Sequence, residues 1–299
     1  MRINLKSFFL GFFLSIISIL TIYILIGKER IRNNQIKINS FIQKLITQKA
    51  ISSEEKFKDC LPKVISYIPN NSSVIIGHAY GRGGTKLKID SLSPKVDKFL
   101  KLNKNKLNTL FLTGDIFNFP SLFRYQKLYK EFEDYFDIYI APGNHEVDGQ
   151  LRRDLFDLYI GEKQPKNLPF YVYNSEFFIV VDDSNLKKTI LDSELDILQN
   201  NLLDKKIIFL RHHVLIDELS PYGGNNLKFY NKDFFEKKLN SKKQILFIYG
   251  NGGMYKNKPR IACFKHKNFT HLLNGIGEFT NDNILIIYKG NIFRYILKN

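Results

Sequence analysis

The chain's most distinctive chemical motif is Pro142-Gly143-Asn144-His145-Glu146, which directly follows an apolar run at Asp137–Ile140. A glycine at this place allows a tight turn, so that the amide oxygen after it can point at a metal ion. The next residue, an imidazole, then stays free to move protons, as histidines do in many enzymes. The motif therefore predicts Asn144 as a metal ligand and His145 as a catalytic residue.

Three other residues that can bind metals follow apolar runs of their own. Asp115 comes after Gly114 and offers a carboxylate, while His212 and His78 each offer an imidazole. Carboxylate, amide and imidazole ligands suit Mn, Fe or Zn, and two such ions can clamp a phosphoryl group for in-line displacement. For His78, a structural role is an equal alternative. The expected ligands of one or two divalent ions are His78, Asp115, Asn144 and His212.

Other histidines and acidic residues have simpler interpretations. His213 is expected to pack beside its neighbour, and His266 and His271 lie in a lysine-rich, apolar stretch typical of structural histidines. Asp182 and Asp183 follow another apolar run, where they are expected to cap the turn or to support the site from behind. None of the five is predicted as a ligand.

These side chains can act together only if the fold brings the ends of their runs to one place. From Ser73 onward, apolar runs of strand length alternate with helical stretches, notably Ser93–Leu102 and Ser193–Leu203. Ser93 is a candidate N-cap, with proline at the first helical position. Since α/β proteins bind ligands beyond the carboxyl ends of their strands, the alternation predicts an α/β domain with its site there. The expected strands are Ser73–Ile76, Thr109–Thr113, Asp137–Ile140, Phe177–Val181, Ile207–Leu210 and Ile245–Tyr249.

From about residue 70 onward the motifs resemble those of the calcineurin-like metallophosphoesterases in type and order. That family's motifs run Asp-x-His, Gly-Asp-x-x-Asp, Gly-Asn-His-Asp/Glu, a histidine often in His-His-Pro, and Gly-His-x-His. Gly143–Glu146 matches the third motif fully, and Gly114–Asn118 matches the second except for Asn118 at its closing aspartate. Arg211–Val214 resembles the fourth, with Val214 where proline is usual.

The resemblance implies a four-layer α/β/β/α sandwich of two mixed sheets and hydrolysis of a phosphomonoester or phosphodiester by metal-activated hydroxide. It implies that Asp115 bridges two metal ions and that Asn144 and His212 bind the second of them. It also implies that His145, held by a neighbouring acidic group, protonates the leaving alkoxide or steadies the transition state.

Two motifs depart from the family pattern. Gly77–Tyr80 replaces Asp-x-His, so the aspartate ligand is missing and His78 is the candidate shifted ligand. Gly250–Gly253 replaces Gly-His-x-His, so two histidine ligands are missing and Asn251 offers an amide oxygen at best. One metal ion, or a weakened pair, is the expected consequence. The alternative is a non-catalytic relative that binds a partner or a phosphorylated ligand.

The N-terminus predicts a membrane anchor. Ser7–Gly27 contains no charged residue, and as a helix it would span about 31 Å, the thickness of a bilayer core. A cleavable signal peptide is the main alternative. The expected organisation is an anchor at 1–28, a helical stalk or linker at 29–69 and the phosphoesterase-like domain at 70–299. Positive charge flanks the segment on both sides, and its modest excess after the helix slightly favours a cytoplasmic domain over the opposite topology.

Composition excludes little else. The net charge is +16, but the lysines are scattered without an arginine-rich run, so a nucleic acid is an unlikely partner and solvated lysines or a membrane-facing basic surface explain them better. The expected partners are a phosphorylated substrate and the membrane. For the two cysteines, Cys60 and Cys263, free thiols are favoured and one disulfide is left open. Oligomeric state is not predicted.

Overall fold

The computed structural model describes the part of the chain that follows the N-terminal segment. The described residues are 59–81, 92–164, 169–173, 176–182, 190–200, 206–222, 229–239, 244–253, 261–277 and 282–298. Contacts divide the chain into the units Met1–Ser52 and Ser53–Asn299, and every described residue lies in the second. The predicted anchor at 1–28 and the predicted stalk up to residue 58 therefore lie outside the described residues. Within the described ranges, no helix is both long and apolar enough to cross a membrane.

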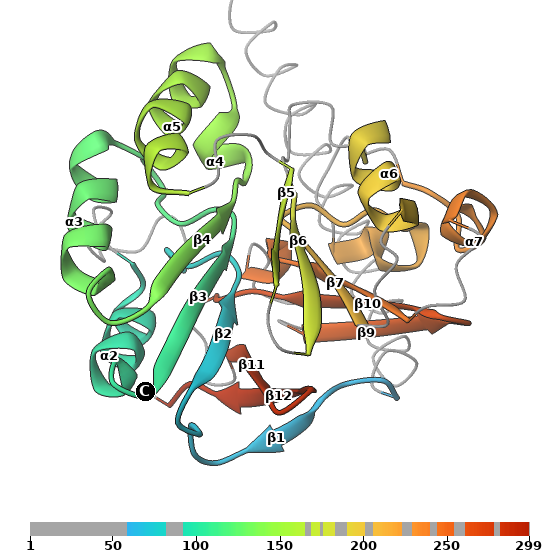
Figure 1. Cartoon of the computed structure of the whole chain (residues 1–299), viewed down its shortest axis with the longest axis horizontal. Coiled ribbons are helices and arrows are strands. Elements are labelled where there is room, and N and C mark those ends of the chain that lie inside the picture. Colours follow the sequence, from blue (N-terminus) through green and yellow to red (C-terminus); the bar gives the residue numbers. More distant parts are fainter. Residues whose placement is uncertain are drawn as a thin grey trace, which may run out of the picture. The chain divides into compact units, whose positions relative to one another are not determined.

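Two six-stranded mixed sheets form the centre of the described domain (Figure 1). In spatial order, sheet A contains β1 (Lys63–Ile65), β12 (Asn291–Ile296), β11 (Asn283–Tyr288), β2 (Ser72–Ile76), β3 (Leu107–Thr113) and β4 (Asp137–Ala141). Sheet B contains β5 (Phe170–Tyr173), β6 (Phe177–Val181), β7 (Lys206–Arg211), β8 (Ile245–Tyr249), β10 (Phe269–Asn274) and β9 (Ile261–His266).

Each sheet has a parallel part whose strands all end at one edge. In sheet A, β2, β3 and β4 run parallel to one another. In sheet B the parallel set is β6, β7, β8 and β10. The carboxyl ends of these strands carry the loops with the predicted ligands, so the topology alone gathers those loops at two sheet edges.

The helices cover the outer faces of the two sheets. One group lies against sheet A and another against sheet B, on opposite sides of the domain (Figure 1). The first group is α2 (Pro94–Asn103), α3 (Leu122–Phe132) and α5 (Gln150–Lys163), and the second is α6 (Asp192–Asn200) and α7 (Phe234–Leu239). The short helices are α4 (Asn144–Val147), η2 (Asp217–Tyr222) and η3 (Asn251–Gly253).

The alternation of side chains along the strands builds three apolar layers. On β6, Phe178 and Val180 face the helices over sheet B, while Ile179 faces the core between the sheets. On β2, Val74 faces the helices over sheet A, and Ile75 faces the same inter-sheet core. Because both faces of each sheet are buried, these strands are apolar throughout, as their sequences indicated. The predicted α/β fold with two mixed sheets is confirmed.

The predicted strands and the first predicted helix agree with the observed elements to within one or two residues. The helix expected at Ser193–Leu203 is α6, described over Asp192–Asn200, and residues 201–203 lie outside the described residues. All six expected strands are present, and Phe177–Val181 and Ile245–Tyr249 have the expected bounds. The expected helix at Ser93–Leu102 is α2, with Ser93 at the N-cap position, although its side chain makes no capping hydrogen bond. The strands β9 to β12 and β5 were not predicted.

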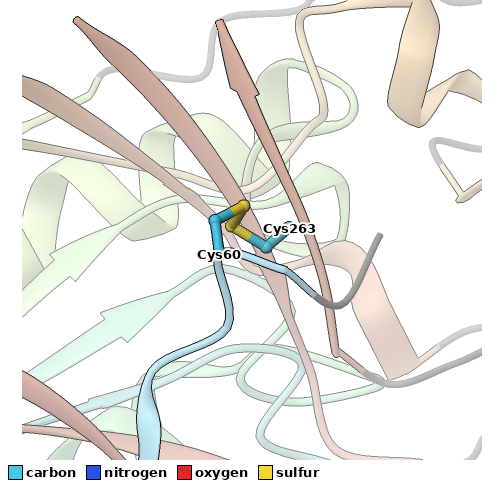
Figure 2. The surroundings of a disulfide bond; sticks show 2 residues. All are labelled: Cys60 and Cys263. Atoms are coloured by element: carbon cyan, nitrogen blue, oxygen red, sulfur yellow. A yellow bond between two sulfur atoms is a disulfide. The ribbon is translucent and has the colours of Figure 1, made fainter. Parts of the chain in front are cut away.

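Two predictions near the start of the domain are wrong. Strand β1 pairs in parallel with β12, so Lys63–Ile65 belongs to sheet A, and the helical stalk or linker predicted for 29–69 does not extend to residue 69. Cys60 and Cys263 form a disulfide and are not free thiols (Figure 2). Neither feature has a local signal, because each depends on a partner more than 200 residues away in the sequence.

Candidate metal centre

The predicted site residues lie where the carboxyl-terminal edges of the two sheets meet. His78 follows β2, Asp115 follows β3 and His145 follows β4, all in sheet A. His212 follows β7 in sheet B, and its Nδ1 lies 3.0 Å from the carbonyl oxygen of Thr113, the last residue of β3. This hydrogen bond joins the two sheets directly beside Asp115.

Three imidazoles surround one carboxylate oxygen of Asp115. Its Oδ2 lies 3.3 Å from His212 Nε2, 3.7 Å from His78 Nε2 and 3.9 Å from His145 Nε2. The side chains of His212, His78 and Asp115 are no more than 4% exposed, whereas that of His145 is 24% exposed. The structure therefore brings four of the five predicted residues together, with His145 as the one most open to solvent.

Asn144 is the fifth predicted residue, and it begins helix α4 beside His145. Its backbone carbonyl accepts the N–H of Asp148 at 2.9 Å, and the residue is half-buried. Among the described residues, no hydrogen bond or ion pair joins its side chain to the other four. Its role as a ligand stays a prediction.

The ring of His212 is fixed in one tautomer. A carbonyl oxygen can only accept, so the hydrogen shared with Thr113 belongs to Nδ1, and Nε2 of the neutral ring carries a lone pair. That Nε2 is buried and has no hydrogen-bond partner among the described residues, yet it faces the Asp115 carboxylate. A lone pair and a carboxylate oxygen at this distance repel each other unless a proton or a metal cation lies between them.

His78 has the same arrangement. Its Nδ1 lies 3.1 Å from the carbonyl oxygen of Ile276, so its Nε2 also presents a lone pair toward Asp115. Burial lowers the pKa of His78 to about 4, against the attraction of Asp115, so that the ring is neutral at neutral pH. Two imidazole nitrogens thus lie within 3.7 Å of one carboxylate oxygen, and these donor types are those that bind a divalent Zn, Mn or Fe ion.

Charge at the centre is concentrated on Asp115. Burial alone would raise the pKa of Asp115, but the nearby imidazoles, His212 first and then His78, hold it well below its usual value when they are charged. For His212, burial lowers the pKa, and the nearby Asp115 carboxylate more than offsets this, so the net shift is upward. In the absence of a metal ion, the proton on His212 balances the carboxylate. A metal cation would take over that role.

The backbone at the centre is held in an uncommon conformation. His78 and Asp115 have φ values of 52° and 53°, in the left-handed region that residues with a side chain rarely adopt. The N–H of His78 donates to the carbonyl of Gly114 at 3.1 Å, which ties the two turns together. Gly114 itself has φ 75°, and a Cβ there would lie 2.6 Å from the backbone of Gly143. Such strain persists only where the surroundings enforce it, and it is common at functional sites.

Glu146 enforces this geometry, and the sequence interpretation gave it no separate role. Its Oε2 accepts the N–H groups of Asp115 at 2.7 Å and of Gly143 at 2.9 Å, and its Oε1 accepts that of Ile116 at 2.8 Å. The side chain is fully buried. Burial raises the pKa of Glu146, and the charge of Asp115 adds to the rise. The residue therefore clamps the loop after β3 to the loop after β4.

His145 is oriented by a backbone carbonyl. Its Nδ1 lies 2.7 Å from the carbonyl oxygen of Asn118, so Nδ1 carries the hydrogen and Nε2 faces the centre. The expected acidic neighbour is Asp115, which contacts the main chain of His145 and faces its Nε2, while the Nδ1 atom is held by a backbone carbonyl. Asn118 replaces the closing aspartate of Gly-Asp-x-x-Asp, and its main chain holds the ring instead. The N–H of His145 also donates to Asp115 Oδ1 at 3.1 Å.

Tyr80 is a second residue that sequence reasoning missed. Its ring centroid lies 4.4 Å from that of His78 and 5.2 Å from that of His145. Burial raises the pKa of Tyr80, with further contributions from Asp115 and Glu146, so the phenol stays protonated. The signal was present, since the spacing of Asp-x-His puts His78 and Tyr80 at the two ends of that motif.

The altered last motif, Gly250–Gly253, lets the ends of the two sheets approach each other closely. A Cβ on Gly250 would lie 1.7 Å from the carbonyl oxygen of Thr113, and one on Gly77 would lie 2.4 Å from the Cα of Gly250. The N–H of Asn251, at the start of η3, donates to the carbonyl of His212 at 3.0 Å. The end of β8 thus supplies backbone contacts in the place where the family motif has histidine ligands.

The residues interpreted as structural mostly have structural contacts. His271 is buried, its Nδ1 lies 2.7 Å from the Tyr249 hydroxyl, and its ring stacks on Phe247 at 4.8 Å. His213 is buried with its ring 4.7 Å from that of His212. Asp182, expected at a turn, instead forms a fully buried ion pair with Arg211. Asp183 lies outside the described residues.

A second group of ligand-type side chains lies at the far end of β9. His266 Nε2 is 3.1 Å from Asp233 Oδ1 and 3.8 Å from Glu236 Oε2. Glu236 is also paired with the ammonium group of Lys267. The ligand atoms of Asp233, Glu236 and His266 lie within 4.8 Å of one another, close enough to hold a metal ion, and His266 Nε2 has no hydrogen-bond partner among the described residues. The structural role of His266 therefore stays a prediction.

Comparisons with known proteins agree with the motifs. A model of the calcineurin-like phosphoesterase family matches residues 88–291, a range that contains Asp115, Asn144, His145 and His212 and begins after His78. No curated protein sequence matches the chain.

Solved structures with a similar arrangement include a purple acid phosphatase from yellow lupin (Lupinus luteus) seeds, with 12% identity and a TM-score of 0.46. The match covers 76% of this chain and 54% of that one, so this chain spans about half the length of the lupin protein. Another is the phosphopantetheinyl hydrolase of Mycobacterium tuberculosis, with 11% identity, a TM-score of 0.41 and coverage of 71% of this chain and 91% of that one. Likenesses of this size do not bear on activity.

Proposed function

Since this chain belongs to the calcineurin-like phosphoesterase family, we propose that it is a metal-dependent hydrolase of a phosphomonoester or phosphodiester. The observation that carries the proposal is the buried His212 Nε2, which faces Asp115 Oδ2 at 3.3 Å without a hydrogen-bond partner among the described residues. A nitrogen of ligand type and a carboxylate thus lie together beside the motifs that predict the metal ion, which supports the proposal. Without a metal ion, this buried pair needs a proton on His212 to balance the carboxylate.

Asp115, His212 and His78 are the residues that would hold the divalent ion, with Asn144 as a fourth candidate. Such an ion, when bound, neutralises phosphoryl charge and lowers the pKa of water. Mn, Fe and Zn all fit the donors, and the loss of the last motif's histidines favours one ion or a weakened pair.

His145 is the proposed proton donor to the leaving oxygen. Its Nδ1–H is committed to the Asn118 carbonyl, so only Nε2 is available to give or take a proton at the centre. It is also the most exposed of the four converging side chains, as a group that must reach a substrate should be. Tyr80, whose pKa is raised, supplies a neutral hydroxyl donor beside it.

The direct test uses the full-length chain purified in detergent and supplied with Mn, Fe or Zn. We expect bound metal in elemental analysis and hydrolysis of an aryl phosphate or of the corresponding aryl phosphodiester. If no ion binds and neither ester is cleaved with any of the three metals, the enzyme proposal is lost.

A second candidate function is favoured by one observation. The backbone contacts of Gly250 leave no space for a side chain where the family motif begins its histidine pair. A domain of this kind could bind a metal ion and a phosphorylated ligand without turning it over. It would show metal binding in the same assay, together with phosphate binding in calorimetry, but no release of product.

The proposed setting is the membrane. Ser7–Gly27 supplies the anchor, and the segment up to residue 58 connects it to the domain. A phosphorylated substrate is the proposed partner, and a nucleic acid is not, because the lysines are scattered along the sequence without an arginine-rich run. Tight, steeply salt-dependent binding of DNA or RNA would contradict this.

A further inference from the structure

The chain's two cysteines join the edges of the two sheets. Cys60 directly precedes β1, the edge strand of sheet A, and Cys263 lies on β9, the edge strand of sheet B. Their Cα atoms are 5.6 Å apart, although 203 residues separate them in the sequence. Figure 2 shows the bond running from the loop before β1 to the neighbouring strand of the other sheet.

The surroundings of this disulfide are those of a structural bond. Cys263 is 1% exposed and belongs to the apolar core between the sheets, next to its strand partner Leu272. Cys60 and Leu61 pack against the same core. Cys263 is shielded in this core, whereas Cys60 is half-buried and lines a solvent-open pocket, so a reductant can reach the bond from the Cys60 side.

The bond also holds a segment that has little else to hold it. Strand β1 has only three residues, and two of them, Lys63 and Val64, are exposed. Beyond its pairing with β12, the segment gains a hydrogen bond from Arg294 Nε to the carbonyl of Pro62 at 2.8 Å. So short a strand buries little apolar surface, and the cross-link therefore supplies much of its attachment. Residues 1–58 join the domain through this segment.

We infer that the domain folds on the oxidising, non-cytosolic side of a membrane and that the Cys60–Cys263 bond fastens the tether to the sandwich there. Disulfides form and persist in oxidising compartments and are rare where thiols are kept reduced. The charges on both sides of Ser7–Gly27 are compatible with either topology, and the disulfide selects between them. The expectation of a cytoplasmic domain gives way to this topology. This last step rests on the proposed function: the substrate is then a phosphoester on the non-cytosolic side of the membrane.

Thiol trapping on the full-length chain in cells tests the bond. Acid-quenched cells are treated with a maleimide carrying a large polymer, with and without prior reduction. We expect no addition to the wild-type chain before reduction and two additions after it, whereas C60S and C263S each take one addition in both conditions. Two additions to the unreduced wild-type chain would overturn the inference.

Topology is read with a C-terminal alkaline phosphatase fusion, which is active only outside the cytosol, and a matched fluorescent fusion that matures only inside it. We expect phosphatase activity and no fluorescence from the full chain, and the opposite pattern would overturn the inference. Spheroplasts that produce the unfused chain should also hydrolyse an added membrane-impermeant aryl phosphate. If thiol trapping and the fusions give the expected results but this hydrolysis is absent, the proposed function is wrong. The inferred non-cytosolic location of the domain is then still supported.

Attachment of the leading segment is measured by thermal unfolding. A reductant should lower the Tm of the wild-type chain by roughly 5–15 °C, since a disulfide closing a long loop typically contributes several kcal/mol. The variant C60S/C263A, which has no bond to reduce, should show no such shift. An equal response of the two proteins to reductant would contradict a stabilising role for the bond.

Discussion

Asp115 organises the candidate centre through both of its carboxylate oxygens. Oδ1 accepts the backbone N–H of His145, which fixes the side chain, and Oδ2 faces the Nε2 atoms of three imidazoles. Each of those imidazoles uses its Nδ1 on a backbone carbonyl, so every ring offers its other nitrogen to the same point. A hydrogen bond from one ring nitrogen fixes the tautomer of the imidazole and leaves a lone pair on the other nitrogen. Metal-binding histidines need this arrangement.

Replacing Asp115 by Asn should abolish metal binding while leaving the turn intact. Asparagine tolerates the left-handed conformation and can still accept the His145 N–H, but it removes the charge that a cation needs. We expect metal affinity to fall by more than about 100-fold, with loss of any phosphoesterase activity. Metal content by elemental analysis and ester hydrolysis measure the two effects.

The matched control is Asp137→Asn, which makes the same chemical change on an exposed residue. Asp137 is the first residue of β4, and the centre lies beyond the other end of this strand. It should keep both metal and activity. If Asp115→Asn retained them as well, the metal centre would have to lie elsewhere.

Replacing His145 by Ala should separate catalysis from metal binding. The ring is the proposed proton donor, and general acid help of this kind is worth about 10²–10⁴-fold in rate. We therefore expect kcat to fall by that factor while the metal content is unchanged. His266→Ala, on the far side of the domain, serves as the control and should keep its kcat. A parallel loss of metal in His145→Ala would make His145 a ligand and not a proton donor.

Among the strands, close backbone contacts occupy the place where the family's last motif has histidine ligands. The ends of β2, β3 and β8 meet at Gly77, Thr113 and Gly250, and no side chain fits between them. Glu146 fastens the loop after β3 to the loop after β4 by accepting three backbone N–H groups. The geometry of the centre therefore depends on strand ends that approach more closely than side chains would allow.

Replacing Gly250 by Ala should destabilise the domain strongly. The added methyl would lie 1.7 Å from the Thr113 carbonyl oxygen, so the two sheets would have to separate at the centre. We expect the free energy of unfolding to fall by more than about 3 kcal/mol, measured by urea denaturation. The same change at Gly161, on helix α5, meets nothing within 4 Å and should stabilise the chain by about 0.5–1 kcal/mol. Similar stabilities for the two variants would show that the sheets are not in close contact here.

A buried acidic pair behind the centre predicts how stability depends on pH. Burial, together with the neighbouring Asp182 carboxylate, raises the pKa of Glu194 to about 11, against the opposing charge of Arg211. The folded state then holds a proton that the unfolded state, with a pKa near 4.5, has released. Stability from this group is complete below the unfolded pKa and is lost as pH rises toward the folded one.

Glu194→Gln should therefore flatten the alkaline side of the stability profile. The Gln amide can donate to Asp182 as the protonated acid does, and its oxygen can still accept the N–H of Leu191. Between pH 6 and about 9, we expect the urea midpoint of the wild type to fall more steeply than that of the variant. Glu162→Gln, on the exposed end of α5, should follow the wild type. A variant as pH-dependent as the wild type would show that Glu194 is ionised in the fold.

At the scale of the whole molecule, the domain has two distinct ends. The carboxyl ends of the parallel strands hold the candidate centre, while the disulfide links the segment before edge strand β1 to edge strand β9. The candidate centre is thus built from strands within the sheets, and the connection to residues 1–58 is built at the sheet margins. Changes in the tether are expected to leave the centre unaffected.

Removal of residues 1–28 tests this separation. The truncated chain should leave the membrane fraction, because the apolar segment Ser7–Gly27 is gone, while metal content and activity per molecule are kept. It must be sent to an oxidising compartment by a cleavable signal peptide so that its disulfide can form. Extraction of the full-length chain by alkaline carbonate alone would contradict the anchor.

Which residue types follow which strands can be read from the sequence alone. Apolar runs with glycine and polar residues directly after them specified β2, β3, β4, β7 and β8, because burial on both faces and a tight turn are local requirements. The order of the motifs, through their resemblance to the family, then predicted the two-sheet fold. It also predicted Asp115, Asn144 and His212 as metal ligands and His145 as the catalytic residue.

How those residues contact one another depends on how the chain packs. The hydrogen bond from His212 to Thr113 joins residues 99 apart, and the one from His78 to Ile276 joins residues 198 apart. The neutral state of His78 and the disulfide of Cys60 also depend on burial and on partners that no local pattern encodes. Local propensity reports what a few neighbouring residues prefer, whereas tautomer, pKa and covalent pairing depend on distances that exist only after the sheets have packed.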